Sequence, residues 1–85
     1  MKEKDVYKQI GGKIMRMRKE KGYSREKLAE YSNISTTFLY EIEKGKKGFT
    51  VAVLLRISNA LGIKCEYFLK DDEVGKGPDY GTLKA

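Results

Sequence analysis

Residues 24–45 read SREKLAEYSNISTTFLYEIEKG and contain two short helical patterns separated by a break at residues 32–34. Ser24 precedes the first pattern and Ser35 precedes the second. A serine hydroxyl at such a position accepts a hydrogen bond from the free backbone N–H groups of the first helical turn. Asn33, within the break, is a residue type that tolerates a left-handed backbone. The stretch therefore predicts two helices joined by a sharp turn.

The second helix of this pair has two chemically different faces, which separate when residues are placed at about 100° intervals around the axis. One face is mostly polar and holds Thr36, Thr37, Tyr40, Glu41 and Lys44, and the other is apolar and holds Phe38, Leu39 and Ile42. A sharp turn followed by a helix with an exposed polar face is the layout of a helix-turn-helix, whose second helix enters the major groove of DNA. An ordinary amphipathic helix shows the same two faces, so DNA binding needs further support.

Net charge and its distribution point to a polyanionic partner. The 85 residues include 18 Lys and Arg and 12 Asp and Glu, which gives a formal net charge of +6 at pH 7. Residues 1–30 carry ten basic and five acidic side chains, whereas residues 71–85 carry two basic and four acidic ones. A basic surface attracts polyanions such as nucleic acids. We therefore expect the partner surface in the first half of the chain.

Length and composition argue against several other classes of protein. A chain of 85 residues builds one domain with a small core, so we expect no enclosed active site and no enzyme. With no histidine and a single cysteine, it can form no internal disulfide, zinc site or Cys-His pair. No apolar run is long enough for a membrane span or a signal peptide. We expect a cytoplasmic protein with no cofactor, no metal and no membrane partner.

The residues before this stretch predict a longer helix, which Asp5 can cap and Gly22 can end. Its apolar stripe has spacings of four, four and three residues and consists of Val6, Ile10, Ile14 and Met17. Gly11 and Gly12 lie in mid-helix, where each costs about 1 kcal/mol relative to alanine, so we expect another helix to approach closely at Gly11. The opposite face, which we expect to be solvated, carries Lys13, Arg16, Lys19 and Lys21.

The order of residues from 10 to 69 resembles the phage-repressor and Cro type of helix-turn-helix protein, also called the XRE family, within the lambda-repressor-like fold. The resembling segments are IGGKIMRMRKEKG at 10–22, SREKLAEYSNIS at 24–35, FLYEIEKGKK at 38–47 and TVAVLLRISNALGI at 50–63. The resemblance implies an all-α bundle of five helices, in which the second and third helices form the DNA-reading unit.

The same resemblance implies the course of the chain after the reading unit. A fourth helix would begin at Thr50, stop at Gly62 and bury Val51, Leu54, Leu55, Ile57 and Leu61. A short fifth helix at residues 65–69 would close the core with Phe68 and with Cys65, which we interpret as a small core residue rather than a redox group. An ion pair between Arg18 and Glu43 would fix the tilt of the reading helix.

Carried over residue by residue, the resemblance places contacts to DNA bases at Thr36, Thr37, Tyr40 and Glu41. It places contacts to the DNA backbone at Arg25, Ser35, Lys44, Lys46 and Lys47. Arg25 stands where relatives most often have glutamine, and its guanidinium favours a phosphate or a guanine. The two threonines lack bidentate groups and would contact thymine methyls or phosphates.

These patterns divide the chain into a helix-turn-helix DNA-binding domain at residues 1–70 and a glycine-containing acidic tail or arm at residues 71–85. We expect a sequence-specific transcriptional regulator that binds double-stranded DNA as a homodimer, at least on DNA. Repression is favoured over activation, because a bound dimer can block a promoter by itself. Dimerisation would use the fifth helix, the tail or the DNA. The alternative is a protein-interaction module, antitoxin-like or an adaptor, with Tyr23, Tyr31 and Tyr40 as interface aromatics.

Overall fold

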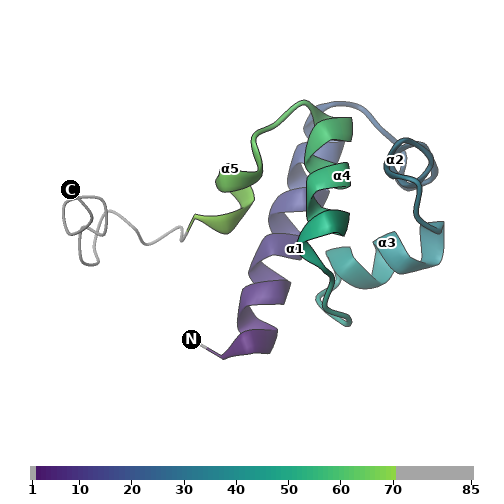
Figure 1. The fold of residues 1–85 in the computed structure, drawn as a ribbon. Helices are drawn as coiled ribbons and strands as arrows, with labels where there is room; N and C mark the ends of the chain where they lie inside the picture. The colour runs from purple at the N-terminus through teal and green to yellow at the C-terminus, as the bar shows by residue number, and fades with distance from the viewer. Residues whose placement is uncertain (1, 71–85) are drawn as a thin grey trace, which may run out of the picture.

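The computed structural model describes residues 2–70, and the predicted tail at residues 71–85 lies outside the described residues. Five helices follow one another: α1 (Glu3–Glu20), α2 (Arg25–Ser32), α3 (Thr36–Glu43), α4 (Val51–Leu61) and α5 (Cys65–Leu69). Residues 2–70 contain no strand, so the predicted all-α fold of five helices is confirmed. In Figure 1, α1 and α4 form the middle of the bundle, with α2 and α3 on one side and α5 on the other.

The turn between α2 and α3 follows the local signals in the sequence. Ser24 Oγ accepts a hydrogen bond from the backbone N–H of Lys27 at 3.0 Å, and Ser35 Oγ accepts one from the backbone N–H of Phe38 at 3.0 Å. Asn33 ends α2 in the left-handed region, with φ 58° and ψ 46°. Its backbone N–H donates to carbonyls of the last turn of α2. The chain therefore turns sharply while these carbonyls stay paired.

The first helix begins earlier than the sequence predicts. Lys2 holds the N-cap position with an extended backbone, and Asp5 lies within the first turn instead of capping it. The predicted start at Asp5 is therefore wrong. Glu3 and Asp5 both complement the positive end of the helix dipole from inside the first turn, which favours a start ahead of them. At the other end, α1 stops at Glu20 with Lys21 as its C-cap, and Gly22, with φ 78°, is the next residue, in agreement with the predicted stop.

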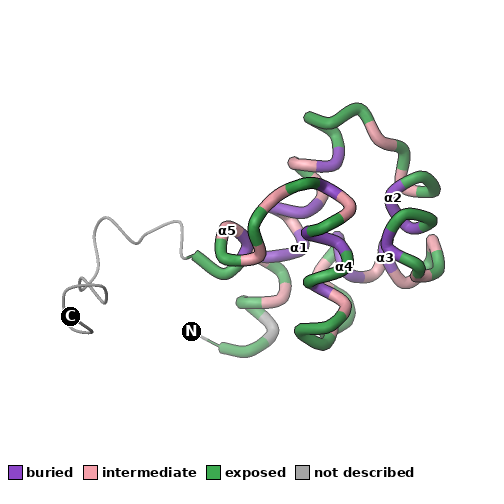
Figure 2. Tube along the Cα trace, turned by 45° about the horizontal axis from the view of Figure 1, so that its top comes forward, coloured by how far each residue is buried: buried purple, intermediate pink, exposed green. Residues whose placement is uncertain are grey.

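All five helices contribute to one core. Its buried apolar side chains are Ile10, Ile14, Leu28, Ala29, Leu39, Ile42, Leu54, Ile57, Leu61 and Phe68. Figure 2 shows the buried positions on the sides of the helices that face one another. Where α1 crosses α3, a Cβ added at Gly11 would lie 2.0 Å from the carbonyl oxygen of Ile42. The close approach of a second helix at Gly11 is confirmed.

Two of the apolar residues predicted for the core lie on an exposed face of α4. Val51 is 68% exposed and Leu55 is 45% exposed, so their predicted burial is wrong. They stand four residues apart and share one face of the helix, whereas Leu54, Ile57 and Leu61 face the core. The sequence of α4 is apolar on more faces than its neighbours cover, and among the described residues no helix packs over Val51 and Leu55.

The basic face predicted for α1 is not uniformly solvated. Lys13 is only 4% exposed, because α5 packs on this side of α1. Its ammonium group donates to the backbone carbonyl of Tyr67 at 3.5 Å and to that of Lys70. Arg16 Nη2 donates to the Tyr67 hydroxyl at 2.9 Å. The prediction of a solvated face is therefore wrong at Lys13, which supplies a donor to carbonyls at the end of α5.

Candidate nucleic-acid interface

A buried carboxylate at the end of α3 joins the first three helices. Glu43 accepts hydrogen bonds from Arg18 of α1, with Nε to Oε2 at 2.7 Å and Nη2 to Oε1 at 3.2 Å. Arg18 Nη1 also donates to the carbonyl oxygen of Tyr23 at 2.9 Å. The guanidinium and the carboxylate thus meet in a two-point contact that fixes both distance and orientation. This is the pair that the resemblance implies, and it sets α3 against α1.

Glu43 also holds Arg25, a contact that was not predicted from the sequence. Arg25 Nε donates to Glu43 Oε1 at 3.0 Å, so one carboxylate serves two arginines. The Arg25 side chain is 28% exposed, whereas the Glu43 side chain is fully buried. Within residues 2–70, the terminal nitrogens of Arg25, Nη1 and Nη2, donate no hydrogen bond to another residue. Arg25 is therefore anchored through one edge of its guanidinium, and the other edge is available to a ligand.

Three cationic side chains surround the ring of Tyr40, which projects from α3 and is 38% exposed. The guanidinium carbon of Arg25 lies 5.2 Å from the ring centroid. The ammonium nitrogens of Lys44 and Lys46 lie 5.8 and 5.4 Å from it. These distances are in the range of cation–π attraction. The structure thus gathers three of the predicted phosphate-contacting residues around one residue of the predicted reading face.

The other predicted interface residues lie along the same helix and the loop after it. Thr37 is exposed and Thr36 is half-buried. The hydroxyl oxygen of Ser35 caps α3, which leaves its hydroxyl proton free to donate. Glu41 is paired with Lys47, whose Nζ lies 3.6 Å from Oε1. The acidic residue on this face therefore has its charge balanced by a neighbouring lysine.

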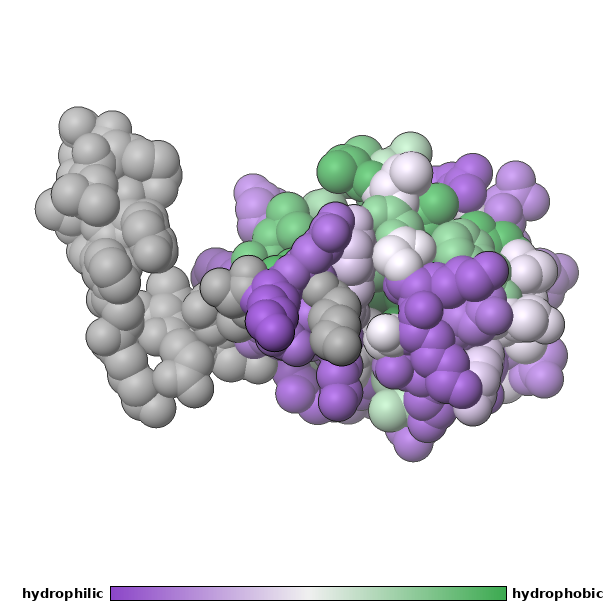
Figure 3. All heavy atoms as spheres, turned by 90° about the horizontal axis from the view of Figure 1, so that it is seen from below, coloured by the Kyte–Doolittle hydropathy of each residue, from purple (hydrophilic) through white to green (hydrophobic). Residues whose placement is uncertain are grey.

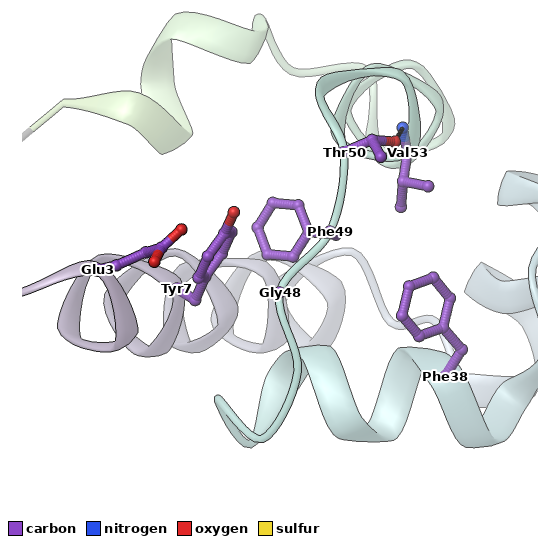
Figure 4. A pocket seen from close by; sticks show the side chains of 7 residues that line it. All are labelled: Glu3, Tyr7, Phe38, Gly48, Phe49, Thr50 and Val53. Atoms are coloured by element: carbon purple, nitrogen blue, oxygen red, sulfur yellow. Dashed lines mark hydrogen bonds between the residues drawn. The ribbon is translucent and has the colours of Figure 1, made fainter.

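An open apolar groove of about 730 Å³ lies between α1, α3 and the start of α4. Figure 4 shows its lining, which consists of Glu3, Tyr7, Phe38, Gly48, Phe49, Thr50 and Val53. The rings of Tyr7 and Phe49 meet edge to face with centroids 5.0 Å apart. Within residues 2–70, no group of three or more Cys, Asp or Glu side chains is placed to hold a metal ion. Most of the side chains that line the groove are apolar, and none of them belongs to the cluster around Tyr40.

Comparison with known proteins places this arrangement in a family. The Helix-turn-helix family HTH_3 matches residues 14–68, which include α2, α3 and most of the core. The chain belongs to the HTH_3 family. The resemblance to the XRE type of helix-turn-helix is thereby confirmed, as is the lambda-repressor-like fold.

Relatives of this HTH_3 chain are named as regulators. It is 36% identical over 64 residues to the HTH-type transcriptional regulator RamB of Mycobacterium tuberculosis. The aligned residues make up 75% of this chain and 14% of RamB. This chain is 33% identical over 70 residues to Control protein C.MunI of Mycoplasma sp, covering 81% and 95% of the two chains. The crystal structure of the clp gene regulator ClgR from Corynebacterium glutamicum superposes with a TM-score of 0.73 at 30% identity, covering 75% of this chain and 68% of ClgR. The chain spans only a small part of the length of RamB.

None of the helices in the described part of this HTH_3 domain is both long and apolar enough to cross a bilayer.

The arrangement that sequence reasoning missed is the joint contact of Arg25 with Glu43 and Tyr40. The sequence contains only an indirect signal for it. Arg25 begins α2 and Glu43 ends α3, so a sharp turn between the two helices can bring these residues together.

Proposed function

We propose that this HTH_3 chain is a sequence-specific double-stranded DNA-binding regulator of transcription that acts in the cytoplasm, as a repressor. The observation that carries the proposal is the cluster of Arg25, Lys44 and Lys46 around Tyr40, beside the exposed Thr37. Clustered cations neutralise DNA phosphates and release counterions, and a helix adjoining them can enter the major groove. A dimer bound over a promoter would block transcription without a further domain.

In this proposal α3 reads the major groove. Thr36, Thr37 and Glu41 face the bases, where the threonine methyls suit thymine and the carboxylate suits the amino group of cytosine. The phosphates are contacted by Arg25, Ser35, Lys44, Lys46 and Lys47. Ser35 can donate its hydroxyl proton to a phosphate oxygen while its oxygen still caps the helix. Specificity therefore depends on a few short side chains, and most of the affinity depends on charge.

A salt titration of DNA binding tests the phosphate contacts. Replacing Lys46 and Lys47 by alanine should reduce the slope of log K against log salt by about 0.9 for each phosphate that is no longer neutralised. Lys64→Ala with Lys70→Ala is the matched control, because it removes the same charge from exposed positions flanking α5, across the bundle from α3 (Figure 1). If the two double variants show the same slope, Lys46 and Lys47 do not contact phosphates.

Base reading is tested by selecting binding sites from a random duplex pool. Thr37→Ala should change the selected sequence with little change in the salt slope, since a threonine hydroxyl and methyl carry no charge. An equal effect of Thr37→Ala on all sequences would remove Thr37 from base recognition. A palindromic site would also support binding as a homodimer, because two-fold symmetry in the protein is mirrored in its operator.

An exposed apolar patch supports the homodimer. Val51 and Leu55 of α4 lie on an uncovered face, and Val51 also lines a smaller groove of about 260 Å³ together with Val6 and Leu69. Figure 3, which views the molecule from below, shows apolar side chains gathered in the upper centre of the view, with hydrophilic ones beside and below them. Exposed apolar surface of this kind marks interaction sites. We assign this patch of Val6, Val51, Leu55 and Leu69 to a second copy of the chain.

A protein-interaction module is the second candidate. It is favoured by Tyr31, which is 53% exposed and meets the ring of Tyr23 edge to face with centroids 5.5 Å apart. Exposed aromatic pairs anchor protein interfaces. A gel shift with random duplex at low salt separates the two candidates. The regulator retards the duplex through its phosphate contacts, whereas the interaction module leaves it unretarded.

A further inference from the structure

The cations around Tyr40 come from two parts of the chain, the start of α2 and the segment that directly follows α3. Arg25 is the first residue of α2, Lys44 is the C-cap of α3, and Lys46 lies in the loop that follows. Their charged groups all lie between 5.2 and 5.8 Å from the centroid of one ring. Exposed lysine and arginine side chains ordinarily spread into solvent, since ordering them costs entropy and like charges repel. The nearness of Lys44 follows from helix geometry, since it stands four residues after Tyr40, whereas the convergence of Arg25 and Lys46 on the same ring needs an attractive centre.

Two groups supply that attraction. The face of the Tyr40 ring carries the negative end of its quadrupole, which attracts cations. The Glu43 carboxylate accepts from Arg25 Nε at 3.0 Å and so fixes the guanidinium at one edge. Because Glu43 is held in turn by Arg18, its position is set by the α1–α3 packing and not by solvent. Arg25 is thus oriented both by a buried carboxylate and by an aromatic ring.

We propose that Tyr40 is a platform that positions Arg25, Lys44 and Lys46 for DNA phosphates, with Glu43 as the anchor of Arg25. This inference rests on the proposed function and assigns Tyr40 a role other than the base contact expected from the sequence. The free edge of the Arg25 guanidinium matches the two-point geometry of a phosphate, and the two ammonium groups act as point charges beside it. The tyrosine hydroxyl has no part in this role.

Phosphates fit this cluster better than base edges do. Arg25 shares Glu43 with Arg18, so Arg18, Arg25 and Glu43 together have one net positive charge. Lys44 and Lys46 add two more positive charges. The edges of bases carry no net charge that such a concentration would neutralise, whereas each phosphodiester carries one negative charge. Ordering the cations before DNA binds also lowers the entropy lost on binding. The ring therefore contributes to affinity and to salt dependence rather than to sequence preference.

The test compares Tyr40→Phe with Tyr40→Leu in duplex binding across a salt series. Phenylalanine keeps the ring face, so Tyr40→Phe should match the unmodified chain in salt slope and in the sequence selected from a random pool. Tyr40→Leu should reduce the slope of log K against log salt by about 0.9 for each phosphate contact that is lost. For each lost contact, the fall in affinity between 50 and 200 mM salt becomes about 3.5-fold smaller. Tyr31→Leu is the control, since its exposed ring has a single lysine nearby, Lys27 at 5.4 Å.

Each outcome bears on the platform. A slope for Tyr40→Leu equal to that of the unmodified chain overturns it, and so does a changed sequence preference in Tyr40→Phe, which would make the hydroxyl a base reader. Thermal unfolding by circular dichroism verifies that each variant is folded at the assay temperature, and Tyr40→Gln replaces Tyr40→Leu if the latter is unfolded. If the unmodified chain fails to retard duplex DNA at low salt, the proposed function itself fails. The two failures are therefore distinguishable.

Discussion

Two adjacent glycines in α1 should respond in opposite directions to the same substitution. A Cβ at Gly11 would lie 2.0 Å from the carbonyl oxygen of Ile42 and 3.2 Å from that of Glu43, whereas a Cβ at Gly12 meets nothing within 4 Å. Alanine is favoured over glycine in a helix by about 1 kcal/mol at either position. Gly12→Ala should therefore raise the free energy of unfolding by about 1 kcal/mol.

Gly11→Ala gains the same helix propensity and loses more at the α1–α3 crossing. Relieving the overlap requires the α3 backbone to withdraw by about 1 Å or more, and overpacking of this kind costs about 1–3 kcal/mol, occasionally more. The shift would also lengthen the hydrogen bonds from Arg18 to Glu43, which are 2.7 and 3.2 Å long. With a total loss of about 3 kcal/mol, the net destabilisation is about 2 kcal/mol.

Urea unfolding followed by circular dichroism measures both variants against the unmodified chain. The expected difference between them is about 3 kcal/mol, which corresponds to about 10–25 °C in Tm for a domain of this size. If Gly11→Ala proved as stable as Gly12→Ala, then α1 and α3 would not cross as closely as the structure shows. The close packing of these two helices, and the position of Glu43 that depends on it, would then be wrong.

Three further experiments test the Glu43 carboxylate, the N-cap of α3 and the exposed patch. Glu43→Gln should lower the free energy of unfolding by about 3–5 kcal/mol, because it leaves two arginines without a charged partner. Arg25→Ala should lower it by less than about 1 kcal/mol. Equal losses for the two variants in urea unfolding would contradict the central role of the Glu43 carboxylate. Ser35→Ala should lower Tm by about 4–8 °C through loss of about 1 kcal/mol of capping, and an unchanged Tm in a thermal melt would mean that the hydroxyl does not stabilise α3. Leu55→Glu should weaken self-association in sedimentation equilibrium, whereas Arg56→Glu, a neighbouring exposed position, should leave it intact; the same association constant for both would exclude Leu55 from the dimer interface.

Features that depend on a few neighbouring residues were predictable. The caps at Ser24 and Ser35 and the left-handed turn at Asn33 are local interactions, and their residue types indicate them directly. Gly11 indicated a close crossing because a glycine in mid-helix is unfavourable without a packing reason. The family resemblance supplied the Arg18 partner of Glu43, which no local pattern contains.

Burial could not be predicted for side chains whose environment depends on a distant helix. Lys13 belongs to a basic face of α1 when that helix is considered alone, and it is buried because α5 returns across it and offers backbone carbonyls. Val51 and Leu55 look like core residues for the converse reason, since their apolar character says nothing about which face of α4 a neighbour covers. In each case the outcome depends on a helix that is distant in the sequence.

The sequence by itself determined α2, α3 and the sharp turn between them, because helix capping and apolar periodicity act over one or two turns, and its resemblance to the XRE family implied α4 and α5. Only the tertiary structure decided that one buried carboxylate holds two arginines, that three cations converge on Tyr40 and that part of α4 stays exposed. These features arise where α1, α2 and α3 meet and where α4 has no neighbour. They depend on distances between helices, which no stretch of sequence specifies alone.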